Sequence, residues 1–143
     1  MITATTRSDV VIGSAILHHV DLRSALRGIR RVLRPDGLGL FHEPLGRNPA
    51  INLYRRLTPT DRSADEHPLT VEDLELVEAT LGPARFEYFH LTSLAALPLL
   101  RTRAFAPVHE RLEHVDRWLM QHMSALSSYA WVVLIRARND KTR

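Results

Sequence analysis

The stretch "SDVVIGSAILHHVDLRSALRGIRRVLRPDGLGLFHEP", from Ser8 to Pro44, decides the fold class. It opens with a continuous apolar run containing β-branched residues, which is typical of a strand buried on both faces. Asp21 is a suitable N-cap, and the apolar residues behind it recur at three- and four-residue spacing, which predicts an amphipathic helix. "RPDG" then ends the helix, with Gly37 expected in a left-handed turn, and "LGLF" forms a second buried strand. Strand, helix and strand make one βαβ unit with parallel strands.

The rest of the chain continues this alternation of helices and strands. Thr70, with Asp73 three residues later, predicts a capped second helix that ends at Gly82. The elements predicted after Pro44 are an irregular connection over 45–68 with a helical turn at 50–57, a helix over 70–82, a strand over 84–91, helices over 93–105 and 106–126 broken at Pro98 and Pro107, and a last buried strand over 129–138. The apolar stripe expected on the helix over 106–126 consists of Val108, Leu112, Val115, Leu119 and Met123. We therefore expect one α/β domain over residues 1–138 and a disordered tail over 139–143.

The composition excludes several classes of protein. The chain has 143 residues, 45% of them hydrophobic, and no cysteine, which allows one sizeable core but no disulfide framework and no thiolate metal site. No apolar run is long enough to cross a bilayer, and residues 1–8 lack the features of a signal peptide, so we expect a cytoplasmic protein without a membrane-spanning segment. The net charge is only +3, and the arginines of the first helix have few aromatic residues beside them, which favours a solvated helix face over nucleic-acid binding.

The motifs between Ser8 and Pro44 resemble a known family. A buried strand that begins D-V-V and leads into L-H-H, a helix that ends in V-L-R-P-D-G, and a strand that ends with Glu43 are similar to the second half of a class I S-adenosylmethionine-dependent methyltransferase domain. Asp36 stands where the family has the first glycine of P-G-G. The resemblance implies an α/β fold, namely the second half of a Rossmann-like, doubly wound sheet that is mostly parallel, with the last strand antiparallel and extra helices before it.

Two features of the resembled family have no counterpart in this chain. These are the glycine-rich loop after the first strand and the acidic residue that holds the cofactor ribose; none of the six glycines forms a G-x-G after a strand and before a helix. We expect roughly the first half of a methyltransferase domain to belong before Ser8, so that the chain is a fragment unless the missing half is supplied otherwise. The strand over 8–17 would then have an unpaired edge, which favours self-association.

Two histidine-containing segments are expected at one edge of the sheet. Ligands of an open parallel sheet bind at the carboxyl ends of its strands, where "LHH" follows the first strand and "HEP" ends the second. His18 and His19 are candidate catalytic residues, because a neutral imidazole can act as a general base; the alternative is that they only line the pocket. His42 and Glu43 are candidates for substrate binding. A divalent metal held by these four residues is an alternative that we do not adopt, and we expect no metal site.

The end of the first strand is a candidate cofactor contact. In the resembled family this region approaches the methionine part of S-adenosylmethionine, which implies binding at Gly13, Ser14 and Ala15. Small residues permit such an approach. Simple strand packing is the alternative.

The remaining candidates lie in the long connection and in the later helices. Arg47, Asn48 and Tyr54 occupy the connection, where substrate recognition is expected, although a solvated loop would show the same composition. Residues 91–105 are unusually apolar, which fits a core helix, a lid over a hydrophobic substrate or a membrane-surface helix. His109, His114 and His122 form no histidine pair at i, i+4 spacing, so we interpret them as surface or helix-packing residues.

Three functions are consistent with the sequence, and the weakest of them is a peripheral membrane protein that uses residues 91–105. The first is S-adenosylmethionine-dependent methyl transfer to a small-molecule acceptor, for which the protein mainly aligns the nucleophile with the methyl carbon and excludes water. The second is a non-catalytic remnant or interaction module of the same fold that does not bind the cofactor, which the absence of the glycine-rich loop favours.

Overall fold

The computed structural model describes residues 7–57 and 67–140. The helices and strands in chain order are β1 (Ser8–Ser14), η1 (Leu17–His19), α1 (Leu22–Val32), β2 (Leu33–Pro44), α2 (Pro49–Leu57), α3 (Val71–Leu81), β3 (Ala84–Phe89), η3 (Ser93–Leu99), α4 (Phe105–His122), η4 (Ser124–Tyr129) and β4 (Val132–Arg138), where η marks a 3-10 helix.

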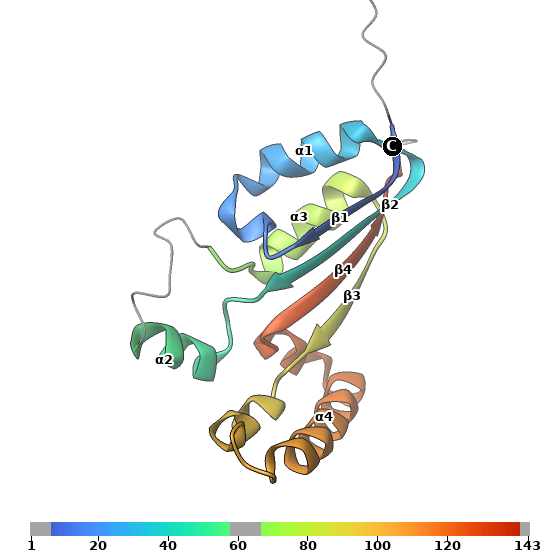
Figure 1. Ribbon diagram of the computed structural model, residues 1–143. Coiled ribbons are helices and arrows are strands. Elements are labelled where there is room, and N and C mark those ends of the chain that lie inside the picture. The colour runs from blue at the N-terminus through green and yellow to red at the C-terminus, as the bar shows by residue number, and fades with distance from the viewer. Residues whose placement is uncertain (1–6, 58–66, 141–143) are drawn as a thin grey trace, which may run out of the picture.

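The four strands form one open sheet in the order β1-β2-β4-β3 (Figure 1). β1 and β2 are parallel, whereas β4 is antiparallel to both of its neighbours, so β1, β2 and β3 run in one direction and the last strand runs against them. This arrangement confirms the predicted α/β sheet, including the antiparallel last strand inserted beside its neighbours. Helical segments η3, α4 and η4 precede that strand, as expected.

The core lies between the sheet and two helices that pack on the same face of it (Figure 1). Leu26 of α1 and Val77 of α3 are fully buried against Phe41 of β2 and Ile135 of β4. A layer of this kind buries one stripe of each helix against one face of the sheet. The connections β1-α1-β2 and β2-α3-β3 therefore place both of their helices on a single side.

The prediction that β1 is buried on both faces is wrong. Val11 packs against the core, but Val10 and Ile12, which point to the opposite face, have exposed fractions of 46% and 75%. β1 is also an edge strand, paired with β2 alone among the described strands. A run that is apolar at every position does not show which of its two faces is covered, because the period-2 signal is absent.

The turn between α1 and the paired part of β2 also differs from the prediction. Asp36, not Gly37, takes the left-handed conformation, with φ of 61°. A short polar side chain tolerates that region. Gly37 is required for a different reason, since a Cβ there would lie 2.9 Å from the carbonyl oxygen of Arg34 and 3.2 Å from that of Asp9.

The predicted N-cap of α1 and both predicted ends of α3 are confirmed. The Asp21 side chain accepts a hydrogen bond from the amide of Ser24 at the start of α1. Thr70 and Asp73 form a reciprocal capping box at the start of α3, and Gly82 ends that helix with φ of 117°. These local signals depend on neighbouring residues only, which explains why they could be read from the sequence.

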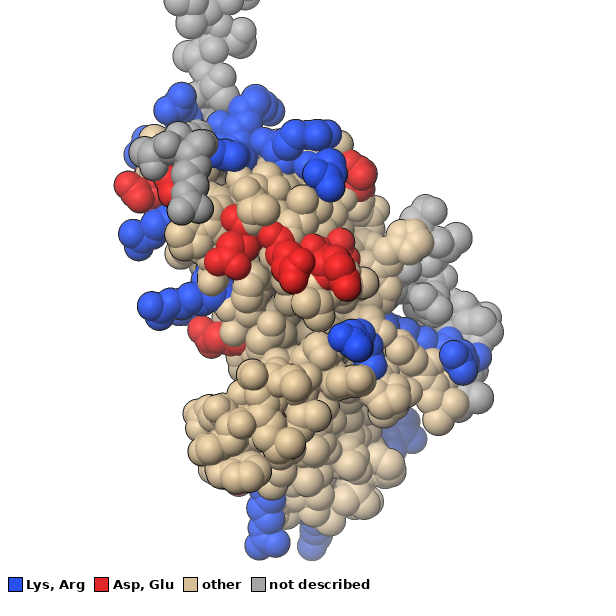
Figure 2. Space-filling model, turned by 180° about the vertical axis from the view of Figure 1, so that it is seen from behind, with Lys and Arg blue, Asp and Glu red and all other residues tan. Residues whose placement is uncertain are grey.

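The segment from η3 to η4 forms a helical extension beyond the carboxyl end of β3 (Figure 1). Pro107 lies inside the first turn of α4, where its missing amide is tolerated, so it does not break the helix as predicted. The predicted apolar stripe is only partly covered: Val115 and Met123 have exposed fractions of 45% and 48%, and the buried residue of α4 is Asp116. Figure 2 shows a lower half with few charged side chains, which is the part formed by this extension.

The predicted tail begins too early. Asn139 is fully buried, and its side-chain amide donates to the carbonyl oxygens of Arg30, Leu33 and Arg34. The amide of Asp140 donates to the carbonyl of Leu81. Both residues therefore tie the end of β4 to the two helices, and residues 141–143 of the predicted tail lie outside the described residues.

Candidate active site at the carboxyl ends of β1 and β2

Glu43 joins the ends of the two parallel strands. Its side chain is fully buried; Oε1 accepts hydrogen bonds from the amides of Ile16 and Leu17, each at 3.0 Å, and Oε2 lies 2.8 Å from Nδ1 of His18. A buried carboxylate needs such partners because its desolvation is otherwise costly. The predicted "LHH" and "HEP" segments do meet at one edge, and Glu43 is the residue that holds them together.

His18 is positioned by this contact and is itself only 5% exposed. In the tautomer whose Nδ1–H donates to the carboxylate, Nε2 carries no proton, which is the state that a general base requires. The backbone carbonyl of His18 also accepts from the amide of His67, which connects the turn to the start of the next described segment. The ring of His19 lies 4.0 Å from that of His18 between centroids, and His19 is exposed.

His42 faces away from Glu43, because successive residues of a strand point to opposite faces. It is exposed, and its Nδ1 lies 3.5 Å from Oγ of Ser14 across the β1–β2 pair. Within the described residues, the group of three or more side chains spaced for a metal lies elsewhere, so His18, His19, His42 and Glu43 do not converge on an ion. Strand alternation accounts for the separation of His42 from Glu43.

The three candidate cofactor residues differ in what they offer. A Cβ on Gly13 would lie 2.8 Å from Cγ2 of Ile16 and 2.9 Å from Cδ1 of Phe41, so the absence of a side chain there serves packing and opens no space. Ser14 and Ala15 are exposed. Ala15 has φ of 51°, and its amide donates to the carbonyl of His42 at 2.8 Å. Of the three, only Ser14 and Ala15 are therefore accessible at this edge of the sheet.

The candidates in the long connection have separate roles. Arg47 is exposed, and its guanidinium lies 5.2 Å from the centre of the Tyr129 ring. Asn48 is 2% exposed; its Oδ1 accepts from the amide of Ile51 at the start of α2, and its Nδ2 donates to the carbonyl of Tyr129. Asn48 therefore caps a helix and ties it to η4. Tyr54 lies in α2, and its side chain is outside the described residues.

A second buried carboxylate, missed in the sequence, organises the helical extension. Asp116 accepts hydrogen bonds from the amides of Leu91, Thr92 and Ser93 and from the Thr92 hydroxyl, and it is 4% exposed. Burial raises the pKa of this carboxyl, but the hydrogen bonds from Thr92 and Leu91 lower it by more, so the pKa lies below the usual value of 3.8. The sequence offered no signal for it, because Asp116 and its partners are more than 20 positions apart.

A hollow of about 360 Å³ lies away from this edge, at the other end of α3. It is lined by Glu75, Glu78, Ala79, Gly82 and Pro83. None of the predicted site residues lies there. The hollow is therefore not part of the candidate active site.

Among the described helices, none is long and apolar enough to span a membrane.

Comparison with known proteins supports the fold. A family model described as a methyltransferase domain matches residues 3–41, a range that includes β1, α1 and most of β2. The structure resembles that of a SAM-dependent methyltransferase from Archaeoglobus fulgidus, with a TM-score of 0.57 and 16% sequence identity over 94% of this chain. The chain has part of the class I methyltransferase fold. It also resembles the DszA carbon methyltransferase, with a TM-score of 0.50 and 19% identity over 95% of this chain.

The chain spans only part of these solved structures. It covers 60% of the Archaeoglobus protein and 29% of the DszA carbon methyltransferase. A sequence search of curated proteins finds no match. At these identities the structural likeness establishes the fold, and the activity of the chain is a separate question.

Proposed function

We propose that the chain supplies the acceptor side of an S-adenosylmethionine-dependent methyltransferase site and that the acceptor is a small molecule. The observation that carries the proposal is the hydrogen-bonded junction of Glu43, His18 and the 16–17 amides. It lies at the carboxyl ends of β1 and β2, the edge at which open α/β sheets bind ligands. The match of residues 3–41 to a methyltransferase domain includes His18 and ends two residues before Glu43.

In this proposal Glu43 is a positioning residue. Both of its oxygens are engaged inside the protein, so it orients the His18 ring and fixes the turn that follows β1. Exposed His19 and Arg47 remain on the surface of the same edge, where an acceptor can reach them. The sulfonium of S-adenosylmethionine carries an already activated methyl group, so the protein's task is alignment and exclusion of water.

S-adenosylmethionine would contact this chain at Ser14 and Ala15. These two residues would contact one side of it, so we expect weak but saturable binding by the chain alone, which a preceding segment or a partner chain would strengthen. The exposed side chains of Val10 and Ile12 on the edge strand suit such a neighbour.

A non-catalytic module is the second candidate function. One observation supports it: both carboxylate oxygens of the buried Glu43 are hydrogen-bonded inside the protein. This junction between the two strands would persist without any ligand. The absence of the glycine-rich loop is consistent with the same view.

Calorimetric titration of the folded chain with S-adenosylmethionine, and with S-adenosylhomocysteine as a second ligand, separates the two. We expect saturable binding that is weakened at least about tenfold, or 1.4 kcal/mol, by Ser14→Leu at the carboxyl end of β1. Asp9→Leu is the matched control, since it adds the same side chain at the opposite end of the strand, where Asp9 is 73% exposed. No heat at millimolar ligand, from a sample with an intact circular dichroism spectrum, would overturn the enzyme proposal for this chain and leave the module.

A further inference from the structure

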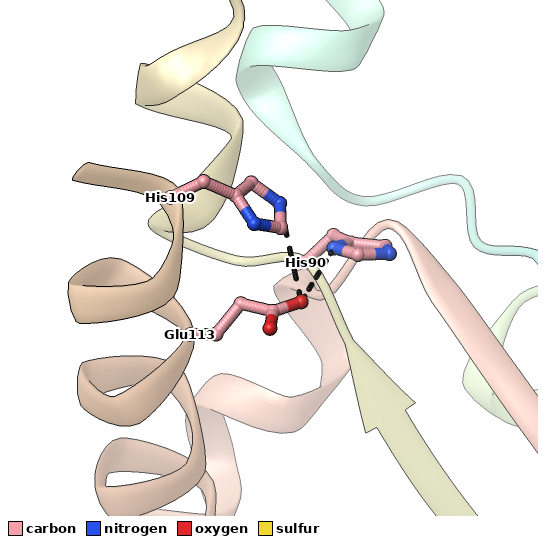
Figure 3. Close-up of side chains that lie close together, drawn as sticks. All are labelled: His90, His109 and Glu113. Carbon is pink, nitrogen blue, oxygen red and sulfur yellow. Dashed lines mark ion pairs between the residues drawn. The ribbon is translucent and has the colours of Figure 1, made fainter. Parts of the chain in front are cut away.

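Two imidazoles and a carboxylate meet where the helical extension joins the sheet. His90 follows the last residue of β3, and His109 and Glu113 lie one turn apart on α4. Oε1 of Glu113 is 4.0 Å from Nδ1 of His90 and 3.9 Å from Nε2 of His109, and the three donor atoms all lie within 4.8 Å of one another. Figure 3 shows the carboxylate of Glu113 pointing toward both rings.

The position of His90 is fixed from two directions. Its carbonyl accepts a hydrogen bond from the amide of Trp131, the residue before β4, at 2.9 Å. The next three residues are bound through their amides to Asp116, which lies on α4 one turn beyond Glu113. His90 itself takes φ of 62°, a left-handed conformation that a non-glycine residue adopts only where its surroundings enforce it. The backbone is thus preorganised to hold the ring beside α4.

The surroundings of the cluster are partly apolar. The ring of Phe105 lies 5.2 Å from that of His109, and the ring of Trp131 lies 6.2 Å from that of His90, measured between centroids. The side chains of His90, His109 and Glu113 nevertheless have exposed fractions of 35%, 28% and 38%. A dissolved ion therefore has access to the donor atoms, and an aromatic ring lies beside each of the two imidazoles.

We propose that His90, His109 and Glu113 form a Zn²⁺ site with an open fourth position. Two imidazole nitrogens and one carboxylate oxygen are a known ligand set for zinc, which binds N and O donors at about 2.0–2.2 Å and therefore needs them about 3.3 Å apart. The side chains must close by about 1 Å, which torsion of three partly exposed side chains allows. Binding also replaces the weak contact of 3.3 Å between Nδ1 of His90 and Oγ of Ser93. Nothing in the proposed methyl transfer requires this ion, so the two proposals are independent.

The test is calorimetric titration of the chelator-washed full chain with ZnCl₂. We expect one saturable site, and we expect His90→Asn, His109→Ala and Glu113→Gln each to weaken it at least about tenfold, the loss that even an outer-shell change causes at metal sites. Asparagine is chosen at position 90 because it tolerates the left-handed backbone. Titration of the unaltered protein with Co²⁺ provides a second readout, since four-coordinate Co²⁺ absorbs visible light strongly.

His114→Ala and Glu110→Gln are the matched controls. Both positions are exposed on α4, and Nδ1 of His114 is bound to the carbonyl of Glu110 within the helix, at 2.7 Å. Their affinity for Zn²⁺ should equal that of the unaltered chain. The proposal is overturned if the unaltered chain shows no saturable Zn²⁺ binding. It is also overturned if the control variants lose as much Zn²⁺ affinity as the ligand variants, or if all three ligand variants keep the affinity of the unaltered chain. Circular dichroism of every variant shows that a loss does not arise from unfolding.

Discussion

At the scale of single residues, two buried carboxylates do similar work at different places in the fold. Glu43 accepts hydrogen bonds from the amides of Ile16 and Leu17. Asp116 accepts hydrogen bonds from the amides of Leu91, Thr92 and Ser93. Each one satisfies the free amides at the start of a short 3-10 segment, and each links segments that are distant in the sequence. Its position at the end of a strand makes Glu43 a candidate in the sequence. Its hydrogen bonds to the turn after β1 become visible only in the structure.

Asp116→Asn is expected to destabilise the protein by about 2 kcal/mol at neutral pH, because the hydrogen bonds to a charged acceptor are weakened. The pKa of Asp116 is lower in the folded state than the usual 3.8, so its contribution to stability is complete above that value and is lost as the pH falls through the folded-state pKa. The difference in unfolding free energy between the two proteins should therefore shrink as the pH is lowered below 3.8. Urea denaturation across a pH series measures it.

Glu110→Gln is the control, since Glu110 is an exposed residue of the same helix. Its midpoint should match that of the unaltered protein at neutral pH. If the unfolding free energies of Asp116→Asn and of the unaltered protein instead differ by the same amount down to the lowest pH, the charge of Asp116 does not stabilise the fold.

At the scale of elements, the helix and strand order could be predicted because its signals are local. Caps at Asp21, Thr70 and Gly82 mark helix ends by their own side chains or by the lack of one. The turn at Asp36 and Gly37 shows the limit of this reasoning. Both residues suit a left-handed backbone. Asp36 adopts it, whereas position 37 needs glycine because Arg34 and Asp9 approach it closely, a contact that the sequence does not reveal.

Gly82→Ala should destabilise the protein by about 3 kcal/mol. With φ of 117°, Gly82 has a backbone conformation that strains any L-residue, and a Cβ would lie 2.7 Å from Cβ of Asp140 and 2.8 Å from the carbonyl oxygen of Arg138. Gly28→Ala is the matched control, because Gly28 lies within α1 and a Cβ there meets nothing within 4 Å. It should stabilise the protein by about 0.5–1 kcal/mol through helix propensity. Thermal unfolding measures the change in stability of both variants. Equal changes in the two variants would contradict the proposed role of Gly82 at the end of α3.

At the scale of the whole molecule, the sequence predicted the layers better than the site. Fold class followed from the βαβ pattern and from the resemblance, whereas the convergence of His90, His109 and Glu113 depends on how β3 meets α4. The i, i+4 spacing of His109 and Glu113 was a signal that a search for histidine pairs alone overlooked. Such a cluster becomes visible only when the third residue is placed by tertiary structure.

Among the described residues, two of the regions that expose large apolar side chains are candidate interfaces. One is the open face of β1, with Val10 and Ile12; the other is the helical extension, where Leu100 and Trp118 have exposed fractions of 59% and 56%. The β1 region adds unpaired backbone groups of an edge strand to its apolar side chains, whereas the backbone groups of a helix are already satisfied internally. We therefore expect the chain to self-associate through β1 and not through α4.

Ile12→Lys should raise the dissociation constant of this self-association at least about thirtyfold, because a buried isoleucine side chain contributes about 2 kcal/mol and a charged residue on an edge strand opposes pairing. Trp118→Lys removes a larger apolar side chain from the other region and should leave the dissociation constant unchanged. Sedimentation velocity over a range of protein concentrations measures both. If the tryptophan variant dissociates while the isoleucine variant does not, the helical extension is the interface, and the edge of β1 must be shielded within the single chain.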